Sequence, residues 1–213
     1  MIAAAGIEDV LFEVAEALRW PVLAAALLAL VFVLFDLGAF VVELSRRHRR
    51  GSLEKLDVAS ASARAALGRE DTEGAARALL PLASSAQMAE TLWLLMGQYG
   101  RPGAGDRMAK CLADFDLGSL RRLERSRMLV RFGPALGLMG TLIPLSPALA
   151  GLASGNVNAL TENLRVAFSV TVVGLLVGAI AFSISLVRDR LYAQDLSDLE
   201  YVAATLAPAD AER

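Results

Sequence analysis

Two threonines lie in the middle of long apolar stretches, where polar side chains are scarce. Thr141 and Thr171 stand in separate runs that carry no charged residue. A threonine hydroxyl both donates and accepts a hydrogen bond, so two of them at one depth in a membrane predict the lining of an ion path. The alternative is packing, in which each hydroxyl donates to its own helix or to a neighbouring helix. From the residues alone, packing is the preferred interpretation.

One acid lies inside the first apolar stretch. Asp36 is the only charged residue between positions 20 and 42, ten residues before Arg46 and therefore about 15 Å from it along a helix. An acid at such a depth is costly and predicts a functional group in the ion path. The alternatives are a protonated side chain or a polar partner from a neighbouring subunit.

Charge is divided sharply along the chain. The 213 residues include 44 charged ones, yet 20–42 and 132–187 together hold only Asp36, Glu162 and Arg165. A helix needs about 20 apolar residues to cross a bilayer core. We therefore expect an all-α integral membrane protein with three spans, a helical cytoplasmic domain and long helices extending from the membrane. The predicted segments are an interfacial helix at 1–19, spans at 20–43, 132–153 and 162–188, a cytoplasmic domain at 44–131, an external turn at 154–161, and a cytoplasmic extension and tail at 189–213.

The positive charges predict the orientation. Residues 44–131 hold 16 of the 21 lysines and arginines. The positive-inside rule then places the N-terminus outside, and the middle domain and the C-terminus in the cytoplasm. Acids rather than bases precede the first span, which argues against a cleaved signal. We expect a multi-pass protein of the plasma (inner) membrane.

Several function classes are excluded by composition and motif. A net charge of −2 provides no excess of positive charge for binding nucleic acid. Because Cys111 is the single cysteine, we expect neither an intrachain disulfide nor a thiolate metal cluster. The membrane portion has no zinc-protease motif and no nucleophile elbow. We therefore expect no enzyme, no catalytic residue and no bound metal.

Helical spacing continues outside the membrane. Ser52 is a candidate N-cap for a helix that Gly68 ends, and Met88 to Tyr99 forms a second apolar stripe. Asp116 is a candidate cap for a third helix that runs into the second span. The third span is expected to continue as an amphipathic helix until Pro208.

Small residues mark the second and third spans. Gly133 and Gly137, like Gly174 and Gly178, are four residues apart, a spacing that allows close helix approach. Gly140 adds to this face, and Pro134 bends the helix and frees a carbonyl. A helix interface and a wet path are both compatible with this pattern.

These stretches resemble a family. Phe132-Gly-Pro-Ala-Leu-Gly-Leu-Met-Gly-Thr-Leu142 is similar to the second-helix motif of the MotA/TolQ/ExbB proton-channel proteins. Val166-Ala-Phe-Ser-Val-Thr-Val-Val-Gly-Leu175 resembles the helix that follows it. The likeness to the family is close over 120–205, whereas 1–115 agree with the family only in the arrangement of their segments.

The resemblance implies a role for the chain. Members form a ring of five copies around two single-span partners of MotB/TolR/ExbD type, and the partner carries the ion-binding aspartate. Flow of H⁺ or Na⁺ then drives mechanical work, without another cofactor. On this view Thr141 and Thr171 face the pore, and Pro134 is the helix-bending proline. The competing class is a non-conducting oligomeric membrane scaffold with the same fold.

One position departs from part of the family. TolQ-like and ExbB-like members place a glutamate five residues before the third-helix threonine, where this chain has Val166. Glu162 lies one turn earlier on the same face, so it is a candidate for the ion entrance. The alternative is an exposed ion pair with Arg165, three residues further on.

Overall fold

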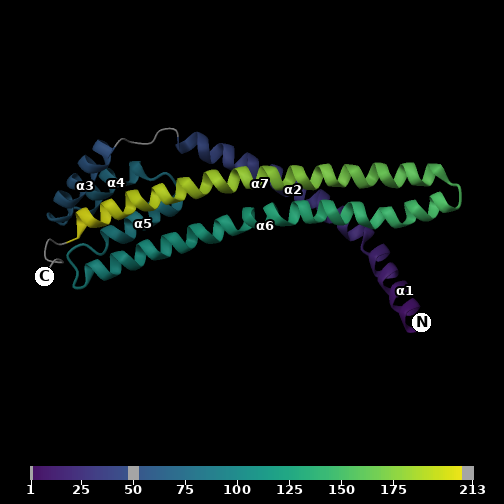
Figure 1. Ribbon diagram of the computed structural model, residues 1–213. Coiled ribbons are helices and arrows are strands. Elements are labelled where there is room, and N and C mark those ends of the chain that lie inside the picture. Colours follow the sequence, from purple (N-terminus) through teal and green to yellow (C-terminus); the bar gives the residue numbers. More distant parts are fainter. Residues whose placement is uncertain (1, 48–52, 208–213) are drawn as a thin grey trace. The chain divides into compact units, whose positions relative to one another are not determined.

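The structure is a computed structural model that describes residues 2–47 and 53–207, and these form helices joined by turns, without any strand. Figure 1 shows the helices α1 (Ile2–Ala17), α2 (Arg19–Arg47), α3 (Leu53–Leu67), α4 (Thr72–Leu79), α5 (Ala86–Met96), α6 (Ala104–Ala153) and α7 (Val157–Leu206), with a short 3₁₀ turn at Leu80–Leu82. The all-α prediction is confirmed. The predicted cap Ser52 and the predicted helix stop at Pro208 lie outside the described residues.

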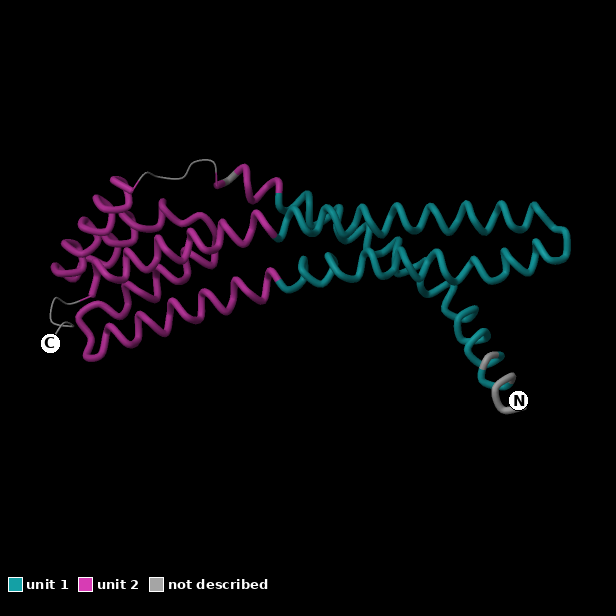
Figure 2. The backbone as a smooth tube through the Cα atoms, in the orientation of Figure 1, with its two compact units in different colours: residues 1–40, 124–185 teal, residues 41–123, 186–213 magenta. Residues whose placement is uncertain are grey.

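The chain divides into two compact units, shown in Figure 2. Unit 1 consists of Met1–Phe40 and Glu124–Ser185, and unit 2 of Val41–Leu123 and Leu186–Arg213. Within the described residues, three helical stretches are long and apolar enough to cross a membrane: Asp9–Ser45, Ala104–Ala153 and Val157–Leu206. This agrees with the three predicted spans.

Unit 1 is held together by contacts among α2, α6 and α7. Val33 of α2 is fully buried with Val177 and Ala181 of α7, and Val130 of α6 packs against them. The rest of this unit's surface is strongly apolar, since side chains such as Phe35 remain exposed. Exposed apolar surface of this extent indicates contact with lipid or with other protein.

The helix α1 passes into α2 almost without a break. The Leu18 N–H donates to the Val14 carbonyl at 3.1 Å, and the Val22 N–H donates to the Leu18 carbonyl at 3.0 Å. Helical hydrogen bonding therefore continues across Leu18, between the end of α1 at Ala17 and the start of α2 at Arg19. The location of α1 on the outer membrane surface stays a prediction.

The turn between α6 and α7 is shorter than predicted. The Asn156 N–H donates to Gly151 and the Gly155 N–H donates to Leu152, which is a Schellman end for α6 with Gly155 at φ +76°. The Asn156 side chain then accepts from the Ala159 N–H at 3.0 Å. Because Asn156 caps α7 directly, the turn spans only 154–156, and the prediction of 154–161 was too long.

Unit 2 has its own hydrophobic core. Leu79 of α4, Leu95 of α5 and Leu199 of α7 are fully buried there, together with side chains from α3 and α6. The ends of α3 and α7 agree with the sequence: α3 stops before Gly68, and α7 continues to Leu206. The long amphipathic extension of the third span thus supplies one wall of this core.

Helix α4 was not predicted. Its N-cap is Asp71, whose side chain accepts from the Gly74 N–H at 2.8 Å. Ser85 caps α5 in the same way through the Met88 N–H at 3.1 Å. Helix α4 has only eight residues, too few for its apolar spacing to stand out in the sequence.

The start of α6 corrects a second prediction. Asp116 was expected to cap the helix, but α6 begins at Ala104, and Asp116 lies in its interior. The preceding Gly103 has φ +68°, which ends the turn after α5. Met108 and Phe115 are buried on one side of the first turns, so packing into the core of unit 2 extends the helix toward its N-terminus.

Candidate ion-pathway site

The α6–α7 hairpin is packed backbone against backbone. A β-carbon added to Gly174 would lie 2.5 Å from the Gly133 carbonyl oxygen and 2.7 Å from the Gly137 Cα. A β-carbon on Gly133 would lie 2.8 Å from the Gly178 nitrogen. Only glycine permits this approach, because no side chain can move aside to relieve a backbone clash.

The prolines do not interrupt α6. The helix continues through Pro134, Pro144 and Pro147. The Pro134 ring fills the space beside Gly178, since a β-carbon there would lie 2.9 Å from the ring. Pro144 has no N–H to offer to the carbonyl four residues earlier, which belongs to Gly140. The Gly140 carbonyl, next to Thr141, therefore lacks the N–H donor that a helix normally supplies four residues later.

Thr171 bonds across the hairpin. Its hydroxyl lies 3.3 Å from the Gly137 carbonyl oxygen of α6 and 3.1 Å from the Ala167 carbonyl oxygen of its own helix. The side chain is half-buried. One donated proton has two acceptors, so the hydroxyl can turn between them.

Thr141 takes a different acceptor. Its hydroxyl donates to the Leu138 carbonyl at 2.7 Å, within α6. A hairpin centred on Asn156 would set Thr141 and Thr171 opposite each other, because each lies 15 residues from that position. Thr171 instead packs on Gly137, one turn of α6 from Thr141. Both bonds are of the kind that helix packing alone produces, so the ion-path role of the threonines remains a prediction.

Asp36 has a partner in its own chain. Its carboxylate accepts from the Ser126 hydroxyl at 3.0 Å, and the acid is half-buried. Ser126 lies six residues before the uncharged run that begins at Phe132, between Arg125 and Arg127. Asp36 is thus level with the arginine-rich part of α6, and the contact attaches α2 to α6. Its predicted place in the ion path is not tested by this contact.

Glu162 lies at the other end of the hairpin. Its carboxylate is 3.6 Å from the Arg165 guanidinium, and both side chains are about three-quarters exposed, at 74% and 77%. This is the exposed pair that the alternative interpretation described. Solvent strongly screens the attraction between two exposed charges. Arg165 therefore neutralises the Glu162 carboxylate only in part.

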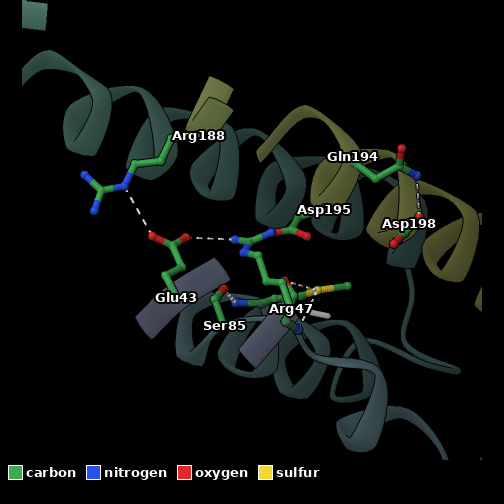
Figure 3. Close-up of polar contacts among 9 residues, drawn as sticks. Glu43, Arg47, Ser85, Arg188, Gln194, Asp195 and Asp198 are labelled. Atoms are coloured by element: carbon green, nitrogen blue, oxygen red, sulfur yellow. Dashed lines mark hydrogen bonds and ion pairs between the residues drawn. The ribbon is translucent and has the colours of Figure 1, made fainter. Parts of the chain in front are cut away.

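A buried ionic cluster in unit 2 was missed by the sequence reasoning. Figure 3 shows Glu43 between two arginines: it accepts from the Arg47 guanidinium at 3.2 Å and from the Arg188 Nε at 3.2 Å. Arg47 also lies 2.8 Å from the Asp195 carboxylate, with 3% and 0% of the two side chains exposed. The cluster therefore ties the end of α2 to α7.

Tyr192 completes this cluster. The Arg47 guanidinium lies 5.7 Å from the centre of the Tyr192 ring, a cation–π distance. Burial raises the pKa of the Tyr192 hydroxyl above 10.0, and the Glu43 carboxylate adds to the rise, against the opposing effect of the nearby arginines. The phenol therefore stays neutral at physiological pH. One sequence signal marks this place: Asp195 interrupts the apolar spacing of Leu191 and Leu199.

These features define a multi-span helical membrane protein whose second and third long helices form a glycine-lined hairpin. Residues 118–200 match the model of the MotA/TolQ/ExbB proton channel family, which confirms the resemblance over this segment. The match includes both threonines, the hairpin glycines and the turn. This family comprises channel and motor subunits rather than enzymes. No curated protein matches the chain.

Proposed function

We propose that the chain is a ring-forming subunit of an ion-driven motor in the plasma (inner) membrane. It conducts H⁺ or Na⁺ together with a dimer of a single-span MotB/TolR/ExbD-like protein, which supplies the ion-binding aspartate. The ring is a homopentamer, with the N-terminus outside and the C-terminus in the cytoplasm. The single observation that carries this proposal is the family match over 118–200.

The chemistry of the hairpin supports a path completed by another protein. Between 132 and 187 the only charged residues are Glu162 and Arg165, so the hairpin itself holds no acid at the depth of the threonines. Thr171 brings a hydroxyl and two carbonyl oxygens together at the helix contact. Such a group can pass a proton or replace part of an ion's hydration without a charge of its own.

The first prediction concerns the Thr171 hydroxyl. Thr171→Val keeps the shape of the side chain but removes its donor. We expect gradient-driven ion uptake to fall about fivefold, since a hydrogen bond is worth about 1 kcal/mol and a tenfold change in rate corresponds to about 1.4 kcal/mol. The measurement is H⁺ and Na⁺ uptake by vesicles that contain the chain together with a candidate single-span partner.

A matched control comes from the same helix. The Thr205 hydroxyl also donates to the carbonyl four residues earlier, at 2.9 Å, but near the end of α7 in unit 2. Thr205→Val should leave uptake unchanged. If wild type, Thr171→Val and the double variant Thr141→Val/Thr171→Val all transport both ions equally, the channel is excluded. A complex that assembles with its partner but transports neither ion would identify a scaffold.

The second prediction concerns Glu162. We expect Glu162→Gln to lower uptake a few-fold at low ionic strength, because an exposed carboxylate at an entrance raises the local cation concentration. The loss should shrink at high salt, where exposed charges are screened over about 10 Å or less. Glu200→Gln, an exposed acid near the far end of the same helix, is the control. Uptake that is unchanged in Glu162→Gln at every salt concentration would end this role.

A further inference from the structure

A pocket lies in unit 1 between the α1–α2 junction and the part of α6 near the turn. Its volume is about 140 Å³, and it is partly open to the surface. The walls are almost entirely apolar, with two charged side chains among them. The lining residues are Phe12, Ala15, Glu16, Arg19, Leu142, Ile143, Ser146 and Pro147.

The apolar walls fit a hydrocarbon chain. An apolar protein cavity of about 150 Å³ takes up benzene rather than water, so this pocket has room for a short segment of an acyl chain. Its lining residues belong to the helical stretches Asp9–Ser45 and Ala104–Ala153, which are long and apolar enough to cross a membrane. The medium in contact with such stretches is the hydrocarbon of lipid.

Arg19 supplies a positive charge that is already held in place. Its Nη2 donates to the Asn163 side chain of α7 at 3.1 Å. Its Nε is buried, and within the described part of the chain it has no hydrogen-bond partner. A buried donor without an acceptor is costly, and a phosphate oxygen is a strong acceptor that matches the geometry of a guanidinium.

Glu16 supplies the opposite charge one turn away. It lines the same pocket, three residues before Arg19, and its side chain is exposed. Residues three apart on a helix are neighbours on one face. The lining thus includes an anion and a cation about one helical turn apart, which is the charge pattern complementary to a zwitterionic headgroup.

The depth of Arg19 agrees with a headgroup. Asn163 is six residues into α7, about 9 Å from the start of that helix near the turn. Trp20, the neighbour of Arg19, is 77% exposed, and exposed tryptophans of membrane proteins gather at the headgroup level. Pro147 and Leu142 lie on the apolar part of α6 before its end at Ala153.

We propose that this pocket binds one zwitterionic phospholipid with a primary-amine headgroup. An acyl chain occupies the space beside Phe12 and Ile143, the phosphate accepts from Arg19, and the ammonium pairs with Glu16. The bound lipid then attaches the α1–α2 junction to α6. This site is independent of ion conduction and of the threonines.

The test is native mass spectrometry of the purified full-length chain. The protein is titrated with phosphatidylethanolamine, phosphatidylcholine and phosphatidylglycerol of identical acyl chains. We expect one phosphatidylethanolamine to bind most tightly, and Arg19→Gln to weaken it about tenfold or more, since hydrogen bonds to charged groups are the strong ones. Ile143→Trp should abolish binding by filling the pocket.

Two further variants keep the test decisive. Arg165→Gln removes an exposed arginine outside the pocket at the same end of the hairpin, and should bind lipid as wild type does. Glu16→Gln changes an exposed side chain, so it tests headgroup preference even if Arg19→Gln folds poorly. Equal binding of all three lipids, or equal binding by wild type and Ile143→Trp, would overturn the site. If copies of the Phe12→Cys variant cross-link to one another and the cross-link prevents lipid binding, the pocket is instead occupied by a second copy of the chain.

Discussion

Gly174→Val should separate the two helices of the membrane hairpin. A β-carbon at this position would lie 2.5 Å from the Gly133 carbonyl oxygen and 2.8 Å from the Gly137 nitrogen, so the clash is with backbone. Overpacking of a core costs about 1–3 kcal/mol, occasionally more, and we expect the upper end because neither helix can yield locally. Thermal unfolding of the detergent-solubilised protein measures this loss.

The separation should also remove ion uptake. The Thr171 hydroxyl reaches the Gly137 carbonyl only because the helices approach closely at Gly174. We therefore expect Gly174→Val to lose stability and transport together. A variant with wild-type stability and wild-type uptake would contradict the close contact.

Two glycine variants serve as controls. Gly38 lies in α2, and apart from the backbone of its own helix no atom of the described residues lies within 4 Å of an added β-carbon, so Gly38→Val should leave the fold intact. Gly137→Ala tests the contact more finely, because its β-carbon would lie 3.4 Å from Thr171, an ordinary contact distance. The expected order of stability loss is Gly174→Val first, then Gly137→Ala, with Gly38→Val least affected.

The long apolar helices could be predicted because lipid imposes a length and a composition on each span. The end of α6 at Ala153 was visible as a change to small and polar residues, and the glycine spacing marked the contact face of the hairpin. The start of α6 was not predictable from capping residues. Asp116 has the right type for an N-cap, but contacts of Met108 and Phe115 with the core of unit 2 decide where the helix begins.

The threonines show the limit for site residues. Their types and their place in the apolar runs were evident, but their mutual register depends on the hairpin geometry. A three-residue turn and backbone packing at Gly174 set Thr171 against Gly137.

The ionic cluster was hidden for a different reason. Glu43 and Arg47 look like exposed juxtamembrane charges, a class whose members usually contribute little to stability. Long-range packing of α2 on α7 places Arg47 beside Asp195 and removes both from water. Sequence spacing shows the odd acid in the apolar stripe of α7, but not the arginine that meets it.

Asp195→Ala should therefore destabilise unit 2 strongly. The Asp195 carboxylate is 0% exposed and 2.8 Å from Arg47, whose side chain is 3% exposed. Removing one partner of a buried ion pair leaves the other charge uncompensated, at a cost of about 3–5 kcal/mol. The nearby Glu43 carboxylate already accepts from Arg188 as well, so it compensates Arg47 only in part. Hydrogen exchange along α7 and thermal unfolding both measure the loss.

A double variant separates charge from packing. Arg47→Met/Asp195→Leu removes both charges and keeps apolar volume, and we expect it to recover most of the lost stability, because apolar replacement of a buried pair is often neutral or better. Asp114→Ala is the matched control, since Lys110 and Asp114 form an exposed pair at 71% and 57% exposure and should contribute about 0.5 kcal/mol or less. If Asp195→Ala is as mild as Asp114→Ala, solvent reaches the cluster. If the double variant is as unstable as Asp195→Ala, the specific geometry of the pair, rather than the buried charge, holds α2 on α7.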